Sequence, residues 1–230
     1  MENAASRAEP SGQTLATSIA TRLREEITSG RIPPGDKLHI DDLRALYGVS
    51  LSPMREALSR LSAEGFVVME NQRGYRVAPI SQSNLREVTK LRSNIETFAL
   101  RESISAGDDH WESEIVASHY RLSKIEKSKP AAARLVEWEA AHREVHQKLL
   151  SACNMPLLLQ FCVTLHDLSD RYRRLFLEDR PIDRDVAKEH SEIVTATLER
   201  RADEACALLR THIERTGKNV LVALTKKQPD

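Results

Sequence analysis

The chain has 230 residues, which is enough for two small domains or one large one. Its 34 basic and 34 acidic residues give a formal net charge of +0, so any affinity for DNA must come from local placement of cations. No apolar run approaches the roughly 20 residues of a membrane span, and the first residues lack a signal-peptide pattern. With three scattered cysteines that we expect to be reduced, the protein is expected in the cytoplasm, without a membrane partner.

The N-terminal part begins with a polar arm and an amphipathic helix. Residues 1–13 are small and polar and are predicted to be a disordered arm, so the first domain is predicted to span 14–79. Apolar residues four apart predict a first helix that ends near Gly30: Leu15, Ile19, Leu23 and Ile27.

Two short helices around a glycine follow. Leu43 and Leu46 give the first an apolar face, and Gly48 ends it because glycine takes positive φ at little cost. Residues at helical spacing predict the buried face of the second helix: Met54, Ala57, Leu58 and Leu61. Small polar and basic residues lie off that face or at its border: Ser50, Ser52, Arg55 and Arg60. The pattern is typical of a helix-turn-helix, although an ordinary helical hairpin shares it.

The next segment favours the DNA-binding interpretation. Residues 65–70 predict a strand, 71–74 a tight turn and 75–79 a returning strand, which together form a wing. Arg73 and Gly74 at its tip combine a cation with a backbone that can approach a phosphate or the minor groove.

These segments resemble the winged helix-turn-helix of GntR-family transcription regulators. The matching stretches are Ile-Pro-Pro-Gly-Asp-Lys-Leu at 32–38, Tyr-Gly-Val-Ser at 47–50, Pro-Met-Arg-Glu-Ala-Leu-Ser-Arg-Leu at 53–61, Glu-Gly at 64–65 and 73–77. The resemblance implies a homodimer on a pseudo-palindromic operator in double-stranded DNA. The DNA-facing residues would be Ser50, Ser52, Arg55, Arg60, Arg73 and Gly74. Leu51 departs from the arginine usual in the family, and Leu-Ser-Pro at 51–53 resembles the carbon-starvation-induced, glutarate-responsive repressor subgroup.

After a short linker, 80–84, the chain is predicted to be helical through residue 225. Apolar stripes mark successive helices, separated near Gly107, Pro130, Asn154, Pro181 and Ala202. No strand-like alternation or repeat interrupts them. The predicted fold is therefore mostly α: a winged helix-turn-helix with a small β-ribbon, then an all-α bundle of six or seven helices for effector binding and dimerisation.

Four of the eight histidines have a spacing that brings them together. His142 and His146 are four residues apart and lie on one helix face. His190 and His212 are each about ten residues from a predicted turn at 201–203, so an antiparallel pair places them at similar height. Imidazoles inside a bundle suit Zn, Ni, Cu, Co or Fe, but ordinary core histidines share this pattern.

The same stretches resemble the FCD domain of the FadR-type branch of GntR regulators. They are Glu-His-Ser-Glu-Ile-Val at 189–194, followed by Arg-Ala-Asp at 201–203, and His-Gln-Lys-Leu-Leu-Ser-Ala-Cys at 146–153. Many FCD domains hold a divalent metal with three histidines, matching His146, His190 and His212, and an aspartate whose place is taken by His142. The resemblance implies a transition metal such as Zn or Ni. The aspartate-to-histidine exchange makes the ligand set neutral, which changes the metal preference or abolishes the site.

The effector prediction also follows from this resemblance. Arg92 is placed to face the cavity, where its charge would need an anionic partner such as a carboxylate ligand that bridges it to the metal. A second cluster consists of Arg171, Tyr172, Arg173 and Arg174, and one of Arg171 and Tyr172 is expected to reach inward. The stretch 169–175 resembles the glutarate-responsive subgroup, so a short dicarboxylate such as glutarate is the predicted effector.

Three functions are compatible with this pattern. The first is a ligand-responsive DNA-binding regulator that acts as a repressor, and the second is a metal sensor. The third, a metal-dependent enzyme fused to a DNA-binding module, is disfavoured. The order His-Arg-Glu-Val-His at 142–146 puts Glu144 one place from the general-base position of a metalloprotease. The sequence therefore predicts no catalytic residues.

Overall fold

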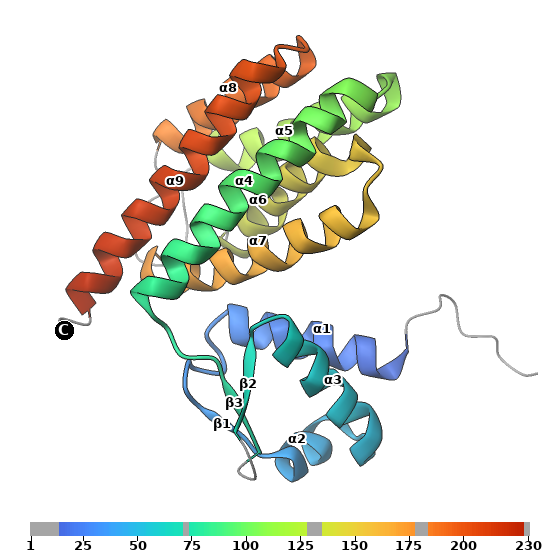
Figure 1. Ribbon diagram of the computed structural model, residues 1–230, viewed down its shortest axis with the longest axis vertical. Helices are drawn as coiled ribbons and strands as arrows, with labels where there is room; N and C mark the ends of the chain where they lie inside the picture. The colour runs from blue at the N-terminus through green and yellow to red at the C-terminus, as the bar shows by residue number, and fades with distance from the viewer. Residues whose placement is uncertain (1–13, 71–73, 128–134, 178–183, 228–230) are drawn as a thin grey trace, which may run out of the picture. The chain divides into compact units, whose positions relative to one another are not determined.

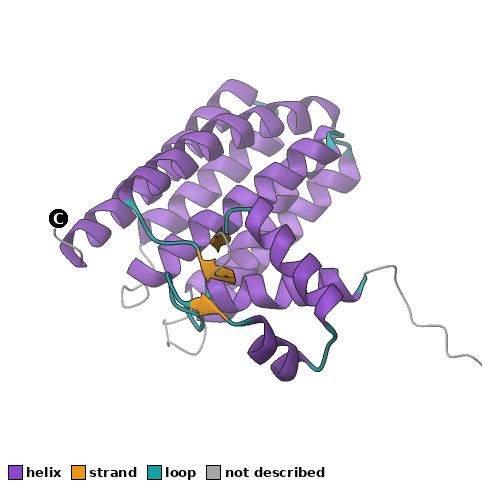
Figure 2. Cartoon of the chain, turned by 60° about the horizontal axis from the view of Figure 1, so that its bottom comes forward, coloured by secondary structure: helices purple, strands orange, loops and turns teal. Residues whose placement is uncertain are grey.

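The computed structural model describes residues 14–70, 74–127, 135–177 and 184–227. The chain divides into two compact units, one ending at Pro79 and the other beginning at Ile80 (Figure 1). Helices make up most of the described residues, and the strands are confined to one small sheet (Figure 2). The predicted disordered arm, residues 1–13, lies outside the described ranges.

The first unit combines helices with an antiparallel sheet. Its elements are α1 (Leu15–Thr28), β1 (Lys37–Leu38), α2 (Ile40–Tyr47), α3 (Leu51–Ala63), β2 (Val67–Glu70) and β3 (Gly74–Val77). The strand order is β1-β3-β2, with Lys37 opposite Arg76 and Val67 opposite Val77. The predicted ribbon had two strands. The third, β1, is only two residues long and carries no alternating pattern that sequence alone could reveal.

The helix-turn-helix has the predicted form, except that Leu43 alone of the two predicted apolar residues of α2 is buried, whereas Leu46 is 66% exposed. Gly48 ends α2 in the left-handed conformation, with φ of 64°. The predicted stripe of α3 is buried: Met54, Ala57, Leu58 and Leu61. At the end of α3, Glu64 accepts hydrogen bonds from Arg24 of α1 at 2.9 and 3.0 Å. This ion pair fixes α3 against α1, so the exposed face of α3 has a defined orientation within its unit.

The second unit is all-helical in its described residues, as predicted. It contains α4 (Gln82–Ala106), α5 (Asp109–Lys127), α6 (Leu135–Leu150), the short 3-10 helix η2 (Ser151–Cys153), α7 (Pro156–Leu177), α8 (Arg184–Leu198) and α9 (Ala202–Lys227). The linker is shorter than the predicted 80–84, because the hydroxyl of Ser81 accepts from the backbone N–H of Asn84 and starts α4 at Gln82. Within the described ranges, no helix is long and apolar enough to cross a membrane.

Helix α4 lies beside α9 and also contacts α6 and α7 (Figure 1). Helices α4 and α9 approach each other closely at Gly217. A Cβ atom built there would lie 2.5 Å from Oγ1 and 2.6 Å from Cγ2 of Thr89. The glycine therefore allows the two helices that carry Arg92 and His212 to pack closely.

We predict that Gly217→Ala destabilises the second unit by about 1–3 kcal/mol, because overpacking against Thr89 outweighs the better helix propensity of alanine. Chemical denaturation of the full chain measures this loss. In a Thr89→Ala background the same substitution should cost clearly less, because the clashing atoms are gone. An equal cost in both backgrounds would show that the contact does not govern the effect.

Candidate metal centre and DNA-facing helix

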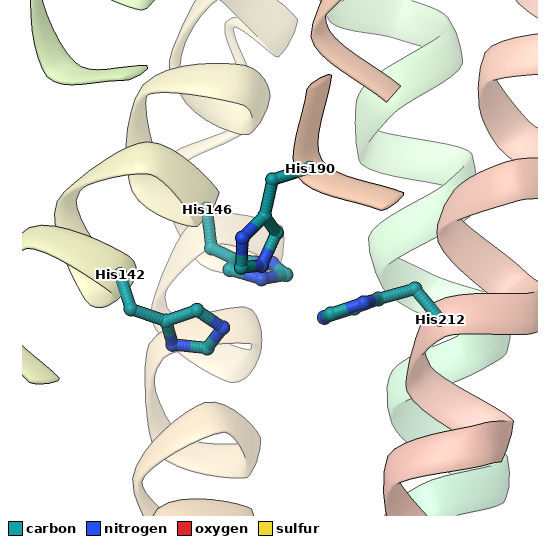
Figure 3. Close-up of side chains that lie close together, drawn as sticks. All are labelled: His142, His146, His190 and His212. Atoms are coloured by element: carbon teal, nitrogen blue, oxygen red, sulfur yellow. The ribbon is translucent and has the colours of Figure 1, made fainter. Parts of the chain in front are cut away.

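Four histidines meet inside the helical unit (Figure 3). His142 and His146 come from α6, His190 from α8 and His212 from α9. All four are buried, and one nitrogen from each lies within 4.8 Å of the others. Ring centroids are between 4.6 and 6.2 Å apart. The structure thus brings together the four residues that the sequence singled out as metal ligands.

Local structure explains this convergence. Trp138, His142 and His146 repeat at intervals of four, so they lie along one face of α6. The chain reverses between α8 and α9 at Arg200, a non-glycine residue with φ of 58°. That tight reversal places His190 and His212 on neighbouring helices, with ring centroids 4.9 Å apart.

Carboxylates flank three of the rings. Glu126 accepts a hydrogen bond from Nδ1 of His190 at 3.2 Å, and Glu189 accepts one from Nδ1 of His212 at 2.8 Å. Glu96 lies 3.9 Å from Nδ1 of His146. These carboxylates hold the proton on Nδ1 of His190 and His212, so their Nε2 atoms carry free lone pairs.

The nitrogen atoms left over fit a metal. Nε2 of His146, Nε2 of His190 and Nδ1 of His142 are buried and have no hydrogen-bond partner among the described residues. Burial lowers the pKa of His142 and His146 well below the usual range and lowers that of His212 to about 4. Neighbouring imidazoles add to these shifts. Neutral imidazole is the form that binds a metal, so the donor set suits a divalent transition ion.

A fifth buried histidine, His166 on α7, escaped the sequence analysis because no regular spacing links it to the others. With Glu96 and His146 it forms a second group of possible ligands beside a cavity of about 210 Å³. Nδ1 of His166 lies 3.1 Å from Nη2 of Arg92, which donates to it, and this leaves the proton on Nε2, 3.6 Å from Asp170. One nitrogen of His166 is thus taken by Arg92, while its Nε2 has no hydrogen-bond partner among the described residues. Because Glu96 of this group is already paired with Arg92, the four-histidine group is the better metal site.

Arg92 finds its anionic partner within the chain. Its guanidinium is buried and donates to both carboxylate oxygens of Glu96, at 2.6 and 3.2 Å, and to the Ser169 hydroxyl at 2.9 Å. Contrary to the prediction, Arg92 therefore does not need a carboxylate ligand to neutralise its charge. Its spacing of four from Glu96 on α4 was a signal that could have revealed this pair.

Arg171 and Tyr172 are both buried on α7. Burial lowers the pKa of Arg171 to about 10. The Tyr172 hydroxyl donates to Asn84 at 2.9 Å and accepts from the backbone N–H of Ser81 at 3.3 Å. Its ring packs in a cluster separate from the histidines, with Leu85, Val220 and Leu224. These contacts hold the start of α4 against α7.

The first unit presents the predicted DNA-facing residues unequally. Ser50, Ser52 and Arg55 are exposed at the start of α3, and Ser50 occupies the N-cap position without a side-chain capping bond. Among the described residues Arg55 has no ion pair, whereas Arg60 donates to Glu56 at 2.6 Å and to Thr17 at 2.8 Å. Arg73 lies outside the described ranges. Gly74 is exposed at the start of β3, with φ of 89°.

Comparison with known proteins agrees with this architecture. The family described as "Bacterial regulatory proteins, gntR family" matches residues 15–77, and the FCD domain matches 87–215. The chain is 37% identical over 205 residues to the transcriptional regulator BphR of Paraburkholderia xenovorans (strain LB400), covering 88% of this chain and 83% of BphR. It is 33% identical over 195 residues to the transcriptional repressor GlaR of Escherichia coli (strain K12), covering 83% and 89%. Because these relatives are transcription regulators, the expectation that the chain is not an enzyme is confirmed.

Solved structures show the same fold. E. coli McbR/YncC aligns with a TM-score of 0.78, at 16% identity, over 94% of this chain and 100% of its own. The metal-free FCD domain of TM0439 aligns with a TM-score of 0.53, at 18% identity, over 65% of this chain and 99% of its own. The expected fold, a winged helix-turn-helix followed by a helical FCD bundle, is confirmed.

We predict that Glu96→Gln destabilises the metal-free chain by about 3–5 kcal/mol, because it leaves the buried Arg92 charge without its counterion. Denaturation in the presence of EDTA measures the loss. The paired replacement Arg92→Met with Glu96→Met should cost much less, since it removes both charges. A loss from Glu96→Gln below about 1 kcal/mol would contradict the pairing.

Proposed function

The chain belongs to the GntR family of bacterial regulatory proteins and carries an FCD domain, and from this premise we propose that it is a metal-loaded, ligand-responsive repressor. The observation that carries the proposal is the buried group of four histidines with unpaired inner nitrogens in the effector domain. The protein would act in the cytoplasm as a homodimer whose two α3 helices enter successive major grooves of a pseudo-palindromic operator.

The described contacts of α3 support different contributions of its residues to DNA binding. Arg55 is exposed and has no ion pair with a described residue, so it is available for a base or a phosphate. Ser50 and Ser52 beside it offer hydroxyls for phosphates. Arg60 is held by Glu56 and Thr17, so it would contribute less. Arg73 and Gly74 remain the proposed contacts of the wing.

The metal would be held by His142, His146, His190 and His212. Zn or Ni suits a set of neutral imidazoles, whereas Mg, Ca and Mn prefer oxygen ligands. When bound, the ion supplies a positive centre that a carboxylate can reach, and it joins three helices of the bundle. The chain's own contribution is to keep the four rings neutral, buried and oriented.

The effector proposed here is a short dicarboxylate. Glutarate is the leading candidate because residues 51–53 and 169–175 resemble the glutarate-responsive repressor subgroup. The cavity beside His146 supports a ligand with an apolar chain, since its walls include Leu150, Leu159 and Val163. The buried polar residues in its lining are Glu96, His146 and His166. A carboxylate would reach the ion past His146 rather than pair with Arg92, whose charge is already matched. Arg171 and Tyr172 would act through the position of α7.

A second candidate is a metal sensor, in which the ion itself is the signal. The closed, all-nitrogen ligand set favours it, because such a set leaves less room for an effector to coordinate. In either case the ligand changes DNA affinity only as far as it binds two conformations of the dimer differently. DNA affinity that changes with metal alone would identify the sensor.

The DNA probe is a duplex that the wild-type chain selects from a randomised pool. We predict that Arg55→Ala weakens binding to this duplex by about 1–3 kcal/mol, the usual scale of a good base contact. Titration at one fixed salt concentration measures it, because phosphate contacts make affinity salt-dependent. Arg60→Ala is the matched control and should have a smaller effect. An unchanged dissociation constant for Arg55→Ala would remove that residue from the interface.

We also predict that Zn(II) or Ni(II) raises the melting temperature of the full chain and that EDTA reverses the shift. A ligand at a hundred times its dissociation constant adds about 2.7 kcal/mol of stability, which corresponds to several degrees. His190→Ala should abolish the shift, and His110→Ala, at an exposed position on α5, should leave it intact.

The same melt with a panel of small carboxylates separates the candidates. A further shift with one dicarboxylate that requires the metal supports the effector proposal. A metal shift without any carboxylate effect favours the metal sensor. If neither metal nor carboxylate shifts the melt, the metal site is wrong, while the DNA-binding assignment is unaffected.

A further inference from the structure

Glu126, near the end of α5, is a buried carboxylate that contacts the histidine group in two ways. Its side chain is 3% exposed. One oxygen, Oε1, accepts from Nδ1 of His190 at 3.2 Å and from the indole Nε1 of Trp138 at 3.3 Å. Trp138 in turn stacks on His142, with ring centroids 4.6 Å and planes 15° apart. One carboxylate thus fixes one ligand ring directly and a second ring through the indole.

The charge of Glu126 distinguishes it from the other carboxylates around the group. Glu96 is paired with Arg92 at 2.6 Å, and Glu189 with Arg215 at 2.7 Å. Among the described residues, no arginine or lysine forms an ion pair with Glu126. A buried carboxylate without a cation is strongly unfavourable. The contacts of Glu126 therefore leave its charge to be balanced by an ion bound to the histidines.

The four histidine ligands lack the negative charge that a bound cation needs. Four neutral imidazoles bring no negative charge to a divalent cation, and the buried position keeps water from screening it. Glu126 lies one hydrogen bond behind His190, which makes it a nearby negative charge that no described arginine or lysine neutralises. Such outer carboxylates also raise the basicity of the imidazole that they contact.

We propose that Glu126 is the positioning and charge-balancing residue of the metal site. It holds the rings of His190 and, through Trp138, of His142, and it supplies from outside the negative charge that the four ligands lack. This assignment rests on the metal site of the proposed function.

Zinc affinity tests the assignment. In the full chain, Glu126→Gln should weaken Zn(II) binding, measured by competition with a chromophoric chelator, by about 10- to 100-fold. The matched control is Glu114→Gln on the same helix, because the partner of Glu114 is Lys148, at 2.6 Å. The Zn(II) affinity of this control variant should equal that of the wild-type chain. Trp138→Phe keeps an aromatic ring against His142 but removes the N–H. It should weaken binding less and alter the visible spectrum of bound Co(II), because His142 is no longer tied to Glu126.

A second background separates charge from general structure. His142→Asp places a carboxylate among the ligands, so Glu126→Gln should cost clearly less there than in the wild-type chain. An equal loss in both backgrounds would overturn the charge-balancing role, and unchanged affinity in the wild-type background would overturn the assignment. Melting of the metal-free variants checks folding. If Glu126→Gln does not fold, Trp138→Phe decides: a Co(II) spectrum identical to wild type overturns the assignment. A wild-type chain that binds no Zn(II) would refute the metal site itself.

Discussion

Four imidazoles packed around one point set the constraint on which the helical unit depends. A buried nitrogen without a hydrogen-bond partner costs about 1–3 kcal/mol. Inner nitrogens of His142, His146 and His190 are in that position among the described residues. The outer nitrogens of His190 and His212 are satisfied by carboxylates. Rotating the His190 ring would therefore only exchange one unsatisfied atom for another. A group that accepts lone pairs relieves this cost, which is why the burial of these rings points to a metal ion.

The buried arginines Arg92 and Arg173 are matched by carboxylates, and this limits how a ligand can bind. Arg92 is neutralised by Glu96, and Arg173 lies between Glu139 and Asp170. Breaking such a buried pair strongly destabilises the fold, whereas an arginine that is already paired gains little free energy from a new carboxylate. An anionic effector in this bundle would therefore gain most from the metal ion, and an apolar chain would gain from the cavity walls. This supports the proposed short acid with an apolar chain over a highly charged ligand.

Sequence predicted what regular spacing encodes. The stripe Met54 to Leu61 gave the recognition helix, and intervals of four and of about ten residues from a turn gave the four histidines. Contacts between elements distant in sequence have no such period. His166 on α7, Glu126 on α5 and the strand β1 acquire their partners only when the bundle or the sheet forms. Arg92 was placed in the interior correctly, and its partner Glu96 lies four residues away on the same helix, a spacing from which this pair could have been predicted.

A continuous set of contacts runs from the histidines to the start of the second unit. Glu96, beside His146, pairs with Arg92, which donates to Ser169 on α7. One turn along α7, the Tyr172 hydroxyl accepts from the backbone of Ser81 and donates to Asn84, where α4 begins. Contacts alone do not transmit a signal, since that requires two arrangements with different ligand affinities. A ligand that moves α7 against α4 would act on the Tyr172 contacts, which lie directly after the boundary at Pro79.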